Sequence, residues 1–338
     1  MVVLVAVLAA TGCSGGDEGS SPPTSTSTSS PTAPPTSTTT TTTAPPATTT
    51  TTAPPPPPPA PVSAWPTAAT TGVVDESALT PWSGDCTFRT PGQVVENKVF
   101  DCGPDIYAPG VTIRNSVVHG NEHWGINVRP EDGEPVVIEH VTIDGGADCR
   151  FGVAIGAGNY RATAVEVVNF GDAFRFSSGN AVVRDSYAKL CAPADSGAHS
   201  DGLQGYLAPS SSPDRPQVLE HTTIDQRCDR WQGDGTKPEN GTGDPADRAC
   251  SVTANVFWSD ESGDGLVVRD NLFRGGGYTI RVHSGSGHTV TGNVVERDSW
   301  AFGAVYSSCG GIDWRDNRVA DIDVDAVASN FAPLDCSE

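Results

Sequence analysis

The stretch VTIRNSVV, residues 111–118, carries the pattern that decides the fold. Its alternating apolar and polar residues are typical of a short β-strand. The pattern returns as VVIEHVTI, YRATAVEV, AVVRDSYA, QVLEHTTI, LVVRDNLF, HTVTGNVV and IDWRDNRV. The third residue of each copy is apolar: Ile113, Ile138, Ala162, Val183, Leu219, Val268, Val290 and Trp314. The fifth residue after each of these is apolar as well: Val118, Ile143, Val167, Ala188, Ile224, Phe273, Val295 and Val319.

The spacing of these copies indicates a solenoid. Successive third residues are 25, 24, 21, 36, 49, 22 and 24 positions apart, so most copies recur at a period in the low twenties and two carry insertions. Such a period suits stacked repeats, and leucine-rich repeats are excluded because the leucine lattice is missing. We therefore predict an all-β protein, a right-handed parallel β-helix of about 8–10 coils with strands stacked about 4.8 Å apart.

Two further columns follow from this stacking. Asn271, Asn293 and Asn317 each lie three residues after a repeat position and should form a ladder of bonded side-chain amides. A second strand recurs later in each coil, in GINVR, GVAIG, AFRFS, GLQGY, NVFWS, TIRVH and GAVYS. Its outward column is predicted to be Asn127, Ala154, Arg175, Gln204, Phe257, Arg281 and Val305.

The N-terminal region differs in composition from the repeats. The apolar run MVVLVAVLAA is too short to span a membrane, which takes about 20 residues, and residues 1–13 resemble a signal peptide ending in the lipobox of bacterial lipoproteins, with Cys13 as the lipidated residue. Residues 14–72 are almost entirely Ser, Thr, Pro, Ala and Gly, which predicts a disordered stalk. The β-helix domain is then expected over residues 73–338.

Charge and cysteine content restrict the partners. The formal net charge is −21, so nucleic acid is excluded as an expected partner because its phosphates require a basic surface. Eight cysteines remain besides Cys13, none in a Cys-x-x-Cys pair, and this favours disulfides in an exported protein over a zinc site. Cys228 can pair with Cys250 across the long insertion or with Cys191 on the neighbouring coil, and both pairings stay open.

The stretch HSDGLQGY, residues 199–206, contains the candidate chemistry. Aligning it with GDAFRF, residues 171–176, puts Asp172 and Asp201 at the same position of adjacent coils, about 5 Å apart. Two carboxylates this close either share a proton or hold a cation, for which Ca²⁺ is the candidate cofactor.

Two reaction classes fit the predicted face. Glycoside hydrolysis needs two carboxylates, and Asp172 could act with Asp201 or with Asp260. Elimination on an acidic sugar needs a cation beside the carboxylate and a base, and here Arg175 or Arg281 could supply the charge and His199 the base. The candidate substrate-binding residues are Gln204, Arg175, Arg281, Asn127, His283 and Trp258.

Each of these residues also has a purely structural interpretation. Asp201 can form an Asx-turn in its Asp-Gly pair, and Gln204 can be a ladder residue. Arg175 and Arg281 can be surface cations of an acidic protein, His283 a solvated loop residue and Asp260 part of an acidic loop.

Three of these motifs also occur in a known family. VRDSYAKL, HSDGLQGY and VRDNLFRGGGYTI resemble motifs of a bacterial subgroup within the secreted, pectate-lyase-like superfamily of right-handed parallel β-helices, over residues 86–330. The resemblance implies the β-helix fold and a carbohydrate-active or adhesive role, without assigning one activity. We therefore expect a lipid-anchored protein on the outer face of the cytoplasmic membrane that binds an extracellular polysaccharide. Cleavage by lyase or hydrolase chemistry and a non-catalytic envelope or adhesion module are the two alternatives.

Overall fold

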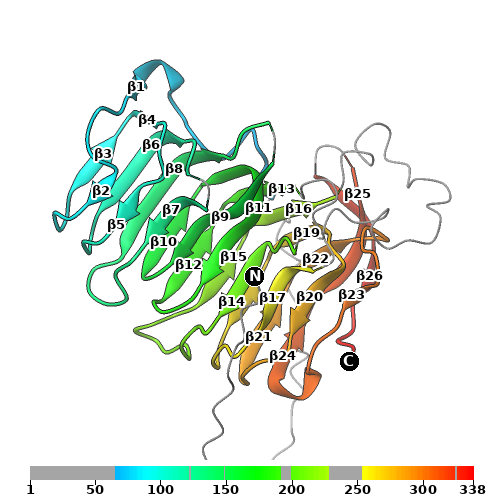
Figure 1. Cartoon of the computed structure of the whole chain (residues 1–338). Helices are drawn as coiled ribbons and strands as arrows, with labels where there is room; N and C mark the ends of the chain where they lie inside the picture. The colour runs from blue at the N-terminus through cyan, green and yellow to red at the C-terminus, as the bar shows by residue number, and fades with distance from the viewer. Residues whose placement is uncertain (1–64, 122, 148, 192–198, 228–252, 324–325) are drawn as a thin grey trace, which may run out of the picture. The chain divides into compact units, whose positions relative to one another are not determined.

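The computed structural model describes residues 65–121, 123–147, 149–191, 199–227, 253–323 and 326–338. These residues form a parallel β-helix, as predicted, and they contain no α-helix. Figure 1 shows the strands stacked in colour order from cyan to orange along one axis. Each complete coil contributes to three strand rows, which we name the first, second and third row in chain order. The predicted signal peptide, Cys13 and residues 14–64 of the stalk lie outside the described residues.

The first row contains the third residues of the repeat. Its strands are β3 (Val94–Glu96), β6 (Thr112–Val118), β8 (Val136–Asp144), β10 (Tyr160–Thr163), β12 (Ala181–Arg184), β15 (Val218–Glu220), β18 (Val267–Arg269), β21 (His288–Thr291) and β24 (Ile312–Arg315). All eight predicted repeat positions are in register from Ile113 on β6 to Trp314 on β24. The predicted alignment of the repeats is therefore confirmed residue by residue.

The second row contains the apolar positions five residues further on. It comprises β1 (Thr80–Pro81), β4 (Lys98–Phe100), the second halves of β6 and β8, the start of β11 (Glu166–Phe176), β13 (Tyr187–Leu190), β16 (Thr223–Gln226), β19 (Leu272–Gly275), β22 (Val294–Glu296) and β25 (Arg318–Ile322). Its predicted column, from Val118 to Val319, is also in register throughout. One antiparallel strand, β26 (Ala328–Pro333), pairs with β25 beyond the last coil.

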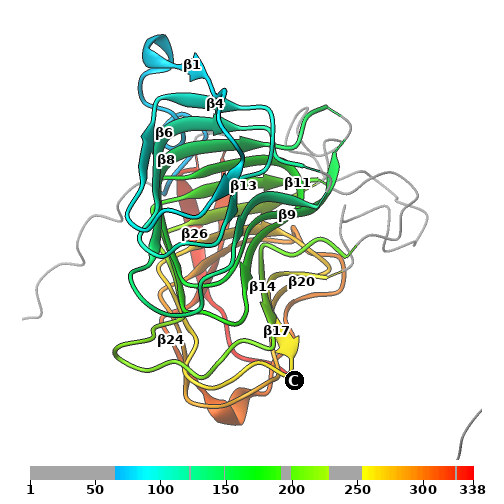
Figure 2. The same ribbon diagram turned by 60° about the vertical axis from the view of Figure 1, so that its left-hand side comes forward.

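The third row carries the candidate site. It comprises β2 (Thr87–Phe88), β5 (Asp105–Ile106), β7 (Trp124–Val128), β9 (Arg150–Ala157), the end of β11, β14 (Leu203–Tyr206), β17 (Ala254–Asp260), β20 (Tyr278–Val282) and β23 (Gly303–Val305). Figure 2 shows β9, β14 and β17 following one another down one side of the solenoid. Two segments outside the described residues, 192–198 and 228–252, fall in the sequence between a second-row and a third-row strand.

The interior is apolar, with one buried polar ladder. Both apolar columns are fully buried from Ile138 and Ile143 through Val290 and Val295. Asn271 Nδ2 donates to Asn293 Oδ1 at 2.9 Å, and Asn293 Nδ2 donates to Asn317 Oδ1 at 2.9 Å. The predicted asparagine ladder is thus confirmed, and it satisfies amides that would otherwise be costly to bury.

A left-handed residue joins the first row to the second in eight successive coils. It stands two positions after the repeat position and has a positive φ in each case: Asn115, His140, Ala164, Asp185, His221, Asp270, Gly292 and Asp316. Asn, Asp and Gly adopt this conformation at least cost, and they fill five of the eight positions. The turn therefore has a local chemical cause that recurs with the repeat.

The segment before the first coil packs along these turns. The Trp65 indole is 6% exposed and donates to the Asp270 carbonyl at 3.2 Å, while the Gly72 N–H donates to the Ala164 carbonyl at 2.9 Å. The short 3₁₀ helix η1 (Glu76–Ala78) follows. The folded domain therefore includes residues 65–72, which the composition had assigned to the stalk. Trp65 explains the difference, since one large aromatic residue anchors an otherwise polar segment.

Three disulfides connect the described cysteines: Cys86 with Cys102, Cys149 with Cys191, and Cys309 with Cys336. The alternative pairing of Cys191 with Cys228 is wrong because Cys191 is bonded to Cys149, and Cys228 and Cys250 lie outside the described residues. The last bond ties the C-terminus to the 3₁₀ helix η4 (Cys309–Gly311). Disulfides are consistent with an extracellular protein. In the described part of the chain, no helix has the length and apolarity needed to span a membrane.

Candidate functional site

One outward column runs along the third row. The strand register connects Asp105, Asn127, Gly156, Arg175, Gln204, Phe257 and Arg281. Because Ile280 pairs with Val305, the column continues to Tyr306. The column contains Gly156 where Ala154 was predicted and Tyr306 where Val305 was predicted, since Ala154 and Val305 are buried.

Arg175 is the most highly connected side chain of this column. Its Nε donates to Gln204 Oε1 at 2.8 Å, and its Nη2 donates to Asp172 Oδ2 at 3.2 Å. The guanidinium also lies 5.6 Å from the Trp124 ring centroid and 5.9 Å from that of Tyr206. A guanidinium held in one plane by two acceptors and flanked by rings is oriented before any ligand arrives.

Gly156 makes room for this arrangement. A Cβ at this position would lie 2.8 Å from Arg175 Cβ and 3.0 Å from the Trp124 ring. The missing side chain lets Trp124 and Arg175 approach each other across the intervening coil. Trp124 and Tyr206 were not among the predicted site residues. A signal was present in the sequence, since Trp124 directly precedes GINVR and Tyr206 ends GLQGY.

Asp172 and Asp201 occupy equivalent positions of adjacent coils, as predicted. Phe174 pairs with Leu203, two residues beyond each aspartate, and the Asp201 N–H donates to Asp172 Oδ1 at 2.9 Å. Asp201 Oδ1 in turn accepts from the Ala254 N–H at 3.2 Å on the following coil. Asp201 is 1% exposed, whereas Asp172 is 9% exposed. The two carboxylates therefore link three coils, and only Asp172 reaches the surface.

The two aspartates differ in pKa and therefore in protonation state at neutral pH. Burial raises the pKa of Asp172 to about 6, although the Asp201 N–H and the Arg175 charge oppose the rise. Burial raises the pKa of Asp201 to about 8, and the negative charge of Asp172 adds to this rise. At neutral pH the pair then holds one proton, on the inner carboxyl, while Asp172 is ionised and paired with Arg175.

The aspartate pair does not fit Ca²⁺. The ion takes about six to eight oxygen ligands, and the described residues contain no group of three or more Asp, Glu, His or Cys side chains that could hold a metal. The outer oxygen of Asp172 is already bonded to the cationic Arg175. A second cation at that oxygen would be repelled by the guanidinium.

Three other predicted site residues differ in their position relative to the aspartate pair. His199 is exposed and close enough to Asp172 to lower its pKa, so these two belong to one site. Asn127 is nearly buried and donates to Asp105 at 3.0 Å, which makes it a contact between coils. Asp260 is in register with Tyr206 and not with Asp201, and it is near enough to Asp201 for its negative charge to add to the rise in the pKa of that carboxyl.

Trp258 was predicted to bind substrate, and this prediction is wrong. The side chain is fully buried, and its Nε1 donates to the Gly263 carbonyl at 3.0 Å. A Cβ at Gly205 would lie 2.3 Å from the indole, so the ring fills the interior space that this glycine leaves. Phe257, the preceding residue, is the one in the outward column.

A second aromatic and cationic group lies further along the row. The Arg281 guanidinium is 5.0 Å from the Phe257 ring centroid and 5.7 Å from that of Tyr306. The His283 ring is 4.6 Å from the Tyr306 ring, and its Nδ1 is 3.1 Å from Ser308 Oγ. Tyr306 also stacks on Tyr278 at 5.0 Å. The predicted residues Arg281 and His283 are therefore brought together.

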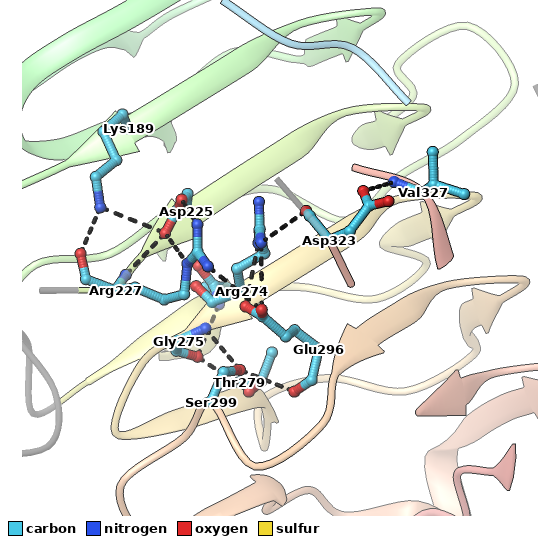
Figure 3. Close-up of polar contacts among 11 residues, drawn as sticks. Lys189, Asp225, Arg227, Arg274, Gly275, Thr279, Glu296, Ser299, Asp323 and Val327 are labelled. Carbon is cyan, nitrogen blue, oxygen red and sulfur yellow. Dashed lines mark hydrogen bonds and ion pairs between the residues drawn. The ribbon is translucent and has the colours of Figure 1, made fainter. Parts of the chain in front are cut away.

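The second row contains a buried ionic network that sequence analysis missed (Figure 3). The fully buried Asp225 accepts from Lys189 at 3.4 Å and from Arg227 at 2.8 Å, and the charge of Lys189 and the hydrogen bond from Arg227 lower its pKa to about 2 against the effect of burial. Arg274 donates to Glu296 at 3.1 Å. The network left a signal in the sequence. The residues six positions after four successive repeat positions alternate in charge: Lys189, Asp225, Arg274 and Glu296. The network has no free carboxylate, which favours a structural role.

Comparisons with known proteins add no functional assignment. No protein-family model, no curated protein and no solved structure matches this chain.

Proposed function

We propose that the protein binds an extracellular polysaccharide along the outward face of the third row. The observation that carries this proposal is the column of rings and hydrogen-bonding side chains from Trp124 through Arg175, Gln204 and Phe257 to Tyr306. Sugar rings present apolar faces and polar edges, so they require flat apolar surfaces alternating with donors and acceptors.

The dimensions of the face suit an extended chain. The row passes from β7 to β23 in six strand steps, which is roughly 29 Å at the usual strand spacing. The aromatic side chains along it are partly or well exposed, with Tyr206 at 48% and Tyr306 at 39%. A polymer lying parallel to the solenoid axis could contact all of them, whereas a small ligand could not.

Two further observations support the proposal. The disulfides are consistent with export, and a lipid anchor at Cys13 with a Thr/Pro stalk would hold the domain outside the cell. The motifs that resemble the pectate-lyase-like superfamily fall on the site, since HSDGLQGY supplies His199, Gln204 and Tyr206.

Cleavage of the bound chain is a second candidate function. It is favoured by Asp172, a carboxyl at the edge of the face that is 9% exposed and whose pKa is raised to about 6, so that it can take or give a proton at ordinary pH. Arg175 would hold the Asp172 carboxylate in place through their ion pair, and His199 would be the second proton-transfer group. Asp201 is inside the solenoid and would not touch the substrate. Its N–H would hold the Asp172 carboxylate in place and affect the pKa of that group.

Binding is tested first, with the full chain and a panel of soluble polysaccharides in affinity electrophoresis. Trp124→Ala and Tyr206→Ala should weaken binding by roughly tenfold each. Phe331→Ala is the matched control because Phe331 is 41% exposed on β26, outside the third row, and it should bind as the unaltered protein does. Binding that is absent for every polysaccharide, or unchanged in both tested variants, would overturn the proposal.

Cleavage is tested on whichever polysaccharide binds. New reducing ends without an ultraviolet chromophore indicate hydrolysis, and a 4,5-unsaturated chromophore indicates elimination. Asp172→Asn should then abolish turnover while binding persists. Bound polysaccharide that stays intact would leave the protein as a non-catalytic binding module of the cell envelope.

A further inference from the structure

The third row contains two groups of similar construction. Arg175 lies between the rings of Trp124 and Tyr206, and Arg281 lies between those of Phe257 and Tyr306. The register from Arg175 through Gln204 and Phe257 to Arg281 separates the two guanidinium groups by three strand steps, about 14 Å. One face therefore presents two cations, each between aromatic rings, at a fixed separation.

The two groups differ in charge. Arg175 is paired with Asp172 and bonded to Gln204. For Arg281 the described residues provide neither a hydrogen-bond acceptor nor a carboxylate within ion-pair distance, and its buried Nε is unsatisfied. Its described neighbours are the two rings and His283, and the Glu338 carboxylate lies close enough to His283 to oppose the lowering of the pKa of that ring. A guanidinium without a carboxylate partner is unexpected in a chain with a net charge of −21, in which acidic residues outnumber basic ones.

His283 adds a second donor beside Arg281. Its Nε2 is buried without a hydrogen-bond partner among the described residues. When the Ser308 hydroxyl donates to Nδ1, the ring proton is on Nε2, and this nitrogen needs an acceptor. Buried donors without an acceptor are unfavourable, and both belong to half-buried side chains beside the exposed ring of Tyr306.

We propose that Arg281 and His283 form an anion subsite, which binds an oxyanionic substituent of the polysaccharide held on the third row, with Phe257 and Tyr306 packing against the adjoining sugar rings. This inference rests on the proposed function and adds the chemical class of the ligand, a glycan bearing carboxylate, sulfate or phosphate ester groups. The bound anion lies about 14 Å along the axis from Arg175. Arg175 contacts the uncharged part of the chain because Asp172 already balances its charge.

The test uses the full chain and polysaccharides that differ only in charge. Dextran and hydroxyethyl cellulose are the uncharged members, and the carboxymethyl, sulfate and phosphate derivatives of dextran and cellulose are the charged ones. Calorimetry at low and at raised salt gives the affinities, and the three anion types distinguish the possible sources of the charge. A single-stranded DNA arm tests for a general polyanion site.

At least one charged derivative should bind roughly tenfold or more tightly than its uncharged parent, and salt should remove the difference. Arg281→Gln should abolish the difference in affinity between each charged derivative and its uncharged parent, and Arg281→Lys should restore part of it. Arg315→Gln is the control because it removes one exposed positive charge from the first row.

Each other outcome has a definite meaning. Equal binding of charged and uncharged polysaccharides, or a preference that survives Arg281→Gln, overturns the anion subsite and leaves the proposed function standing. Equally tight binding of DNA also overturns it, since the site would then read charge alone. Failure of every polysaccharide to bind overturns both proposals.

Discussion

Replacing Asp201 by Asn tests the electrostatic account of the site most directly. The carboxyl is 1% exposed, and its Oδ1 accepts the Ala254 N–H. Asparagine has nearly the same shape and retains an oxygen acceptor for this bond, but it cannot ionise. The variant therefore removes the ionisation of this side chain while preserving the link between coils.

The magnitude follows from the pKa of Asp201. An aspartate in an unfolded chain titrates near pH ~3.9, and burial raises the pKa of Asp201 in the folded protein to about 8. The folded state thus holds its proton more tightly, so the stabilisation is complete below about pH 4 and is lost as pH rises toward 8. A difference of about four pKa units corresponds to on the order of 5 kcal/mol between these limits.

Urea unfolding at about pH 5, 7 and 9 measures the effect. The unaltered protein should lose stability steadily over this range, and Asp201→Asn should flatten the profile and be the more stable protein at about pH 9. Asp313→Asn is the control, because this exposed carboxylate is paired with Arg315 and has a lowered pKa. The reasoning is refuted if the unaltered protein is equally stable at all three pH values, or if the variant keeps the same slope.

Three other changes test the structural elements. Asn293→Leu removes four hydrogen bonds of the asparagine ladder and should lower the free energy of unfolding by about 3 kcal/mol, as measured by urea titration. Arg274→Met leaves Glu296, whose side chain is 14% exposed, with Arg227 as its remaining ion-pair partner and should cost about 3 kcal/mol in the same titration. Trp65→Ala should release the segment that crosses the turns, and limited proteolysis before Gly72 should become faster while the β-helix stays intact.

The first two rows could be predicted accurately because only certain residue types are tolerated at their interior positions. Interior positions such as Ile138 and Ile143 must be apolar in every coil, and a buried Asn must bond to the Asn above it. The left-handed turn fixes the distance between the two columns, so one repeated motif gives the phase of both. The register from Ile113 to Trp314 therefore follows from residue type alone.

The third row was harder to predict because the register between its neighbouring strands shifts along the chain. A register shift between Phe170 and Asp172 where β11 pairs with β9, and another between Gly205 and Tyr206 where β14 pairs with β17, each displace the residues that follow. Alternation placed Phe257 correctly in the outward column, but apolar residues occur on both faces of this row, so its buried neighbour Trp258 was still taken for a binding residue. Burial, and with it the protonation of the aspartates, depends on side chains from other coils that no local pattern reveals.

The inner carboxyl has a consequence for the whole face. Because Asp201 holds a proton, the aspartate pair carries one negative charge, which Arg175 balances, and the middle of the third row is close to neutral at pH 7. The Arg281 end keeps its positive charge. The face is therefore asymmetric along the solenoid axis, and under the anion-subsite proposal a polymer with an acidic substituent at Arg281 is fixed in register with Asp172. Cleavage by Asp172, if observed, should then fall at a defined number of sugar units from an acidic one, and random product lengths would contradict this arrangement.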